Sequence, residues 1–220
     1  ITLNILEACT KNKIKRLVNP ISNCTYPAKA NFFKEEEYWD GPMHESVMVY
    51  GLARKASWMG SLAFSKQYNL DTVNLIFSNM YGPEDHFEEE RSHALGALVM
   101  KILKAKKNKK KIVTIWGTGK PVREWLHVDD AAEAMFRAID ARKCEEPINV
   151  GVGKGISIIE LANKIKNISG YQGDFVFDTT KQDGADYKTM DSDFAKKYFN
   201  WVPSIKFKKG LEDTIDWYTE

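Results

Sequence analysis

The chain has 220 residues, which at about 150 residues per domain corresponds to one large domain or one and a half, enough to bury a sizeable core. Lys and Arg number 32 and Asp and Glu number 30, so the net charge is only +2. This balance argues against a protein that wraps nucleic acid or binds a membrane through a polybasic surface. The 43% of hydrophobic and 28% of charged residues predict a folded, globular chain.

The cysteines indicate a reducing environment. Cys9, Cys24 and Cys144 are odd in number and widely spaced, without a CxxC pair or a cluster with histidine. We therefore expect neither a disulfide framework nor a metal site, and a cytoplasmic location. No apolar run approaches the roughly 18 residues of a membrane span, so we expect no membrane partner.

Helices and strands alternate in the first third of the chain, which is typical of an α/β protein. The residues Leu52, Ala56, Met59 and Ala63 follow the spacing of an apolar stripe on an amphipathic helix. In chain order we expect a helix over 1–10, a strand over 14–22, an irregular segment over 26–45, a helix over 50–68 and a strand over 71–77.

The remaining elements follow a turn at 78–83 and an acidic loop that ends at Glu90. We expect helices over 92–104, 129–140, 157–168, 192–199 and 211–218, and extended segments over 111–116, 123–128, 148–150 and 175–178, with a polar loop over 179–187. Asp129 or Asp130 is the expected N-cap of its helix, and Ser157 and Glu160 form a capping box. The glycines of 151–155 lack the GxGxxG spacing and predict a turn rather than a dinucleotide loop.

Tyr50 and Arg54 are four residues apart at the start of a predicted helix, so their side chains share one face. A phenol becomes a useful acid or base near neutrality when a cation lowers its pKa. Ser22 lies at the carboxyl end of a predicted strand, where open α/β sheets bind ligands. By itself a Tyr-x-x-x-Arg pair is also common in surface packing.

Four segments with their mutual spacing resemble the extended short-chain dehydrogenase/reductases, the NAD-dependent epimerase/dehydratase family. They are Ser22-Asn23-Cys24-Thr25-Tyr26-Pro27, Tyr50-Gly51-Leu52-Ala53-Arg54, Ser78-Asn79-Met80-Tyr81-Gly82-Pro83 and the run from Trp116 to Asp130. The resemblance covers the whole chain and is greatest to the GDP-L-fucose synthase group. It implies a Rossmann-like doubly wound parallel sheet, truncated at its N-terminus, with a smaller α/β substrate lobe. Residues 1–80 would form part of the dinucleotide-binding domain, and part of 112–150 would return to that domain. Residues 81–220 would mainly form the substrate lobe.

The resemblance also implies catalytic roles. Tyr50 would donate a proton to the C4 oxygen during hydride transfer, Ser22 would hydrogen-bond that oxygen, and Arg54 stands where the family has a lysine that holds the nicotinamide ribose. Cys24 and His93 match the base and acid of epimerisation. Such chemistry is reasonable because a 4-keto group acidifies the neighbouring C–H bonds. Taken singly, a lone cysteine such as Cys24 is usually inert packing, and a lone histidine such as His93 is usually a helix-start residue.

Binding residues follow from the same resemblance. The cofactor would be NADP, with NAD as the alternative, and the partners a nucleotide-sugar substrate and a second copy in a homodimer. Arg123 can grip a pyrophosphate bidentately, whereas Lys101 replaces a common arginine; Trp116 and Lys188 match other pocket positions. The expected cofactor contacts are Pro20, Ile21, Ser22, Asn23, Tyr50, Arg54, Phe77, Ser78, Asn79, Met80 and His93.

Two departures keep alternatives open. Arg54 presents a larger, planar group than lysine, and Lys55 points about 100° further round the helix and cannot replace it. The strand, glycine-rich turn and helix that hold the cofactor pyrophosphate are absent, so we expect a fragment of a protein of roughly 300 residues. The alternatives are another nucleotide-sugar epimerase, dehydratase or reductase, or a catalytically silent relative that serves as a binding subunit.

Overall fold

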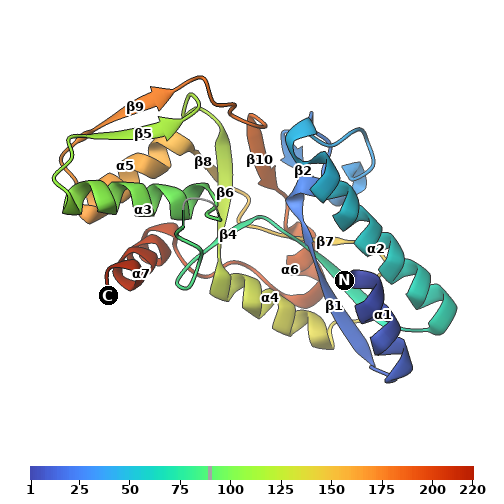
Figure 1. The fold of residues 1–220 in the computed structure, drawn as a ribbon. Helices are drawn as coiled ribbons and strands as arrows, with labels where there is room; N and C mark the ends of the chain where they lie inside the picture. The colour runs from blue at the N-terminus through green and yellow to red at the C-terminus, as the bar shows by residue number, and fades with distance from the viewer. Residues whose placement is uncertain (89–90) are drawn as a thin grey trace.

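A parallel three-stranded sheet forms one half of the protein, in a computed structural model that describes residues 1–88 and 91–220 (Figure 1). Its order is β1 (Arg16–Ser22), β3 (Asp71–Phe77) and β7 (Ile148–Val150). The helices α2 (Met48–Tyr68) and α4 (Val128–Asp140) both contact β1 and β3, while α1 (Thr2–Lys11) packs on α2 and α6 (Asp193–Phe199) on β7. The α/β organisation expected from the sequence is confirmed.

The second half contains short strands and three helices. A mixed sheet has the order β2 (Phe32–Phe33), β10 (Tyr187–Met190), β6 (Val122–His127) and β4 (Asn79–Tyr81), with β8 (Gly155–Ser157) antiparallel to β6. A separate parallel pair, β5 (Ile112–Trp116) and β9 (Asp174–Asp178), shares a core with α3 (Ala94–Lys107), α5 (Ile158–Ser169) and α7 (Phe207–Thr219). No helix in the described ranges is long and apolar enough to cross a bilayer.

Four strands were not expected from the sequence: β2, β4, β8 and β10. Each has only two to four residues, too few to show an alternating pattern, and each is specified by its pairing partner in the sheet. Between β1 and α2 the chain forms three single-turn 3-10 helices, η1 (Asn23–Thr25), η2 (Glu35–Glu37) and η3 (Glu45–Val47).

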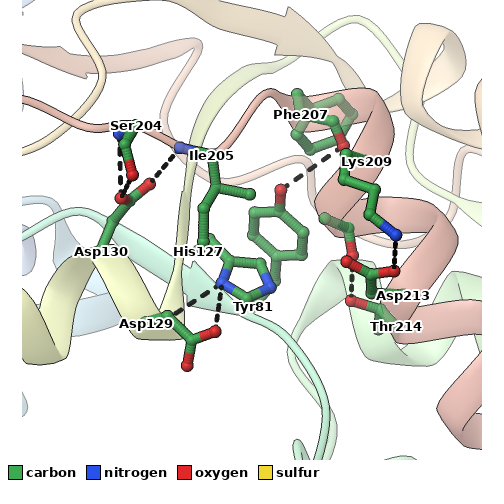
Figure 2. Close-up of polar contacts among 11 residues, drawn as sticks. Tyr81, His127, Asp129, Asp130, Ser204, Ile205, Phe207, Lys209, Asp213 and Thr214 are labelled. Atoms are coloured by element: carbon green, nitrogen blue, oxygen red, sulfur yellow. Dashed lines mark hydrogen bonds and ion pairs between the residues drawn. The ribbon is translucent and has the colours of Figure 1, made fainter.

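The capping box of Ser157 and Glu160 is confirmed, whereas the expected N-cap of α4 is wrong. The cap is His127, whose Nδ1 accepts a hydrogen bond from the Asp129 backbone N–H at 3.2 Å. Asp130 is buried instead and accepts hydrogen bonds from Ser204 and from the Ile205 N–H, as Figure 2 shows. It therefore fastens the segment before α7 to the start of α4.

The apolar stripe expected on α2 is largely exposed. Leu52 is 60% exposed, and Ala56 and Ala63 also face solvent. The buried face carries small polar side chains, because Ser57 and Ser61 hydrogen-bond to Asn19 on β1. Periodicity identified a helix but did not reveal which face meets the sheet.

A fully buried carboxylate, Glu124 on β6, joins three segments of the chain. Its oxygens accept hydrogen bonds from the backbone N–H groups of Val152 and Gly153 in the loop after β7 and of Met190 on β10. Burial raises the pKa of Glu124 from 4.5 to about 7, although these donors lower it. Glu124 thus couples β6 and β10 to the end of the parallel sheet.

Replacing Asp130 with alanine should reduce the free energy of unfolding by about 2–4 kcal/mol, because the N–H groups of Ser204 and Ile205 lose their acceptor. Urea unfolding would measure this. Asp129→Ala is the matched control: its side chain is 77% exposed, and we expect a change within about 0.5 kcal/mol. Equal losses in both variants would contradict the assignment.

Glu124 should give unfolding a distinctive pH dependence. The unfolded carboxyl ionises at 4.5 while the folded one keeps its proton until about pH 7, so its stabilising contribution is present below pH 4.5 and declines as pH rises to 7. We expect the stability of the wild type relative to Glu124→Gln to fall by about 3 kcal/mol over that window. Urea titrations at several pH values, with Glu146→Gln as an exposed control, would test it. A difference independent of pH would refute the effect.

Candidate active site

The first turn of α2 rests directly on the backbone that follows β1. A Cβ atom at Gly51 would lie 2.6 Å from the Cys24 carbonyl oxygen, a distance that no side chain tolerates. Glycine therefore permits the close approach, and Tyr50, its neighbour in sequence, lies at the same end of the sheet as Ser22 and Cys24. Three of the predicted catalytic residues are brought to one edge in this way.

The segment after β1 is a tight 3-10 turn that Ser22 caps. The Ser22 hydroxyl accepts a hydrogen bond from the Cys24 N–H at 3.2 Å. Asn23 is buried, and its Nδ2 has no hydrogen-bond partner within the described part of the chain. Of the other predicted contacts on β1, Ile21 is buried and Pro20 is exposed.

Tyr50 is half-exposed at 48%, and Arg54 lies one turn further along the same face. The guanidinium carbon of Arg54 lies 5.1 Å from the centre of the Tyr50 ring, so the positive charge stacks on the phenol ring. Lys55 is buried and donates a hydrogen bond to the Tyr38 carbonyl at 2.8 Å. The expectation that Lys55 cannot take the place of Arg54 agrees with this geometry.

Cys24, Arg123 and Lys188 meet although they are far apart in sequence. Lys188 Nζ lies 3.8 Å from Cys24 Sγ. Lys188 and Arg123 are register partners on the parallel strands β10 and β6. Burial lowers the pKa of the Arg123 guanidinium, whose Nη1 donates to the Val122 carbonyl at 2.8 Å.

A second cluster surrounds the exposed indole of Trp116 at the end of β5. Lys101 Nζ lies 4.5 Å and Lys181 Nζ 5.6 Å from the ring centre. Trp116 is 56% exposed, so its indole lies at the surface and is not part of a hydrophobic core. Asp183 connects the two clusters: its carboxylate accepts bonds from Thr118, and its carbonyl from Arg123 at 3.4 Å.

The remaining predicted residues lie apart from these contacts. Phe77 and Ser78 are buried where β3 ends, and Asn79 donates a hydrogen bond to the Glu124 carbonyl. Met80 is 45% exposed. His93 is the exposed N-cap residue of α3, and within residues 1–88 and 91–220 no hydrogen bond or ion pair joins it to Cys24.

Three contributors were missed from the sequence. Glu124 and Asp183 act through backbone hydrogen bonds between distant segments, which no local pattern reveals. His44, to which the sequence assigned no role, lines the same small cavity as Cys24 and Lys188. Only the fold brings these residues together.

Comparisons with known proteins agree with this architecture. Residues 1–151 match the model of the NAD dependent epimerase/dehydratase family. A probable GDP-L-fucose synthase 1 of Oryza sativa subsp. japonica is 36% identical over all of this chain and 67% of its own length.

Solved structures are similar along the same length. The GDP-L-fucose synthetase of Naegleria fowleri bound to NADP has a TM-score of 0.88 and 29% identity, over 99% of this chain and 67% of that one. A GDP-6-OMe-4-keto-L-xylo-heptose reductase of C. jejuni has a TM-score of 0.90 and 29% identity, over 100% and 74%. With its Rossmann-like fold, the chain belongs to the NAD dependent epimerase/dehydratase family.

Proposed function

We propose that this protein epimerises a GDP-4-keto-6-deoxy sugar and reduces it with NADPH. The observation that carries the proposal is the meeting of Cys24 with Lys188 and Arg123 beside the first turn of α2, which bears Tyr50. A thiol and a phenol at one sheet edge supply a group for proton abstraction from carbon and a group for proton donation to oxygen. The relatives named as acting on GDP-linked sugars support the substrate class.

The reduction step uses Ser22 and Tyr50. As hydride reaches C4, the C4 oxygen gains negative charge, which the Ser22 hydroxyl stabilises and the Tyr50 proton neutralises. Arg54 holds positive charge against the Tyr50 ring. From there it would hold the nicotinamide ribose of a bound cofactor. These are proposed roles for side chains whose positions suit them.

The carboxyl ends of β1 and β3 fit the nicotinamide end of a dinucleotide. The buried Nδ2 of Asn23, unpaired among the described residues, offers a donor there, and Ser78 follows β3 at the same edge. When bound, NADP supplies the hydride. We favour NADP over NAD because a similar solved structure is described as bound to NADP.

Epimerisation would use Cys24 and His93 on opposite sides of the sugar. Cys24 removes a proton from a carbon next to the 4-keto group, and His93 returns one to the other face. Arg123 and Lys101 would bind the pyrophosphate, and Trp116 would stack against the base.

We also propose a homodimer that forms through the outer face of α2. Val49 is 87% and Leu52 60% exposed on this helix, and Ala56 and Ala63 continue the apolar strip. Such a continuous apolar surface is costly to leave in water.

The two chemical steps separate in a paired experiment with GDP-4-keto-6-deoxymannose. Cys24→Ser should stop solvent deuterium from entering C3 and C5, because the base is lost, while Tyr50→Phe should preserve this exchange. Tyr50→Phe should instead lower NADPH oxidation by roughly a hundredfold or more. Mass spectrometry and absorbance at 340 nm measure the two steps, and Tyr68→Phe, at the far end of α2, is the control.

The outcomes discriminate between the proposed and alternative functions. NADPH oxidation without deuterium exchange would favour a simple reductase of the same family. Neither activity in the wild type would favour a silent binding subunit and would overturn the proposal.

Leu52→Glu should convert a dimer to a monomer, because it places a charge in the apolar strip of α2. Light scattering with size-exclusion chromatography measures the mass. Ile112→Glu, on β5 at the other end of the molecule, is the control, since Ile112 is also exposed at 56% (Figure 1). A monomeric wild type, or a dimer in the Leu52 variant, would contradict the proposed interface.

A further inference from the structure

The Lys188 ammonium group lies beside the thiol rather than in open solvent. Nζ is 3.8 Å from Cys24 Sγ, and both side chains are partly buried. They line one small cavity together with Asn23, Tyr26 and His44.

The backbone fixes the position of this ammonium group. Lys188 follows Tyr187 on β10, where both residues pair with β6, and two residues later the Met190 N–H donates to the buried Glu124 carboxylate at 2.8 Å. β10 is therefore bound to β6 on both sides of Lys188. Its side chain approaches the thiol from a strand rather than from a mobile loop.

The charges around the pair are mixed. Burial lowers the pKa of Lys188, the nearby thiol raises it, and the Arg123 guanidinium lowers it again. Asp183 and Asp186 act on Arg123 from the loop before β10. The titratable groups around Cys24, Lys188 and Arg123 are Tyr26, His44, Tyr187, Asp183 and Asp186.

We propose that Lys188 is a positioning residue for the epimerisation half of the reaction: its ammonium group, 3.8 Å from Cys24 Sγ, stabilises the thiolate that removes the substrate proton. The identity of the substrate in this inference rests on the proposed function. The effect of Lys188 on the Cys24 thiol does not, because it follows from the contact between the two side chains. A cation beside a partly buried cysteine favours the thiolate, which is the reactive form. The role differs from the nucleotide contact expected from the sequence.

The proton balance of the step is simple. The Cys24 thiolate takes a proton from C3 or C5, the electrons of the broken C–H bond form a C=C bond, and the carbonyl pair moves to the C4 oxygen as an enolate. Cys24 is then a thiol, and Lys188 remains an ammonium ion throughout. His93 protonates the enolate from the opposite face and so completes the inversion. Proton exchange with solvent then restores Cys24 and His93 to their starting states.

Alkylation of the free protein by iodoacetamide tests the inference without substrate or cofactor. Peptide mass spectrometry would measure the rate of Cys24 alkylation at several pH values in the wild type, Lys188→Met and Lys188→Arg. Lys154→Met is the matched control, since Lys154 is exposed. We expect Lys188→Met to slow alkylation of Cys24 at pH 7 at least about fivefold, because the cation 3.8 Å from the sulfur is lost. Lys188→Arg keeps a cation and should retain most of the rate, and Lys154→Met should match the wild type.

Cys9 and Cys144 report on folding in the same samples, since both are free and partly buried. If their rates rise in Lys188→Met, the variant has unfolded, and Lys188→Gln takes its place. An unchanged Cys24 alkylation profile in a folded variant overturns the inference. If the wild type shows no deuterium exchange with substrate while Lys188→Met still slows the alkylation of Cys24, the proposed function is refuted and the pairing of Lys188 with Cys24 stands.

Discussion

A carboxylate that accepts hydrogen bonds from the backbones of two other segments fixes their relative positions, and Glu124 does this at the centre of the protein. It lies on β6 next to Arg123 and binds Met190 of β10, two residues beyond Lys188. It also binds the loop that leaves β7. The alignment of Arg123 and Lys188 with the parallel sheet therefore depends on this one buried acid. Burial also raises the pKa of Glu124 and so favours its neutral form.

Charge in this protein is placed locally rather than spread over a surface. The net charge is +2, yet Arg123 and Lys188 converge on Cys24, and Lys101 and Lys181 flank Trp116. A few cations in a partly dry site interact more strongly than the same number in solvent. The sequence total therefore says little about the field that a bound anion would meet.

The sequence was informative wherever a local pattern determines the structure. The long strands, the helices and the capping box of Ser157 and Glu160 follow from periodicity and hydrogen-bonding chemistry, and all are present. Short strands such as β4 and β10 lack that information because their partners lie far along the chain. The cap by His127 and the contact of Lys188 with Cys24 likewise arise from tertiary structure. The predicted motif positions nonetheless converge in part, since Ser22, Cys24 and Tyr50 lie at one edge.

The polar contacts between α2 and β1 carry a mechanical consequence. Ser57 and Ser61 both hydrogen-bond to a single amide, Asn19, which in turn bonds to Asn74 on β3. A shift of the helix along the strand would break several buried hydrogen bonds at once. This short row of polar side chains therefore helps to fix the position of α2 along β1, and with it the position of Tyr50 relative to the end of that strand.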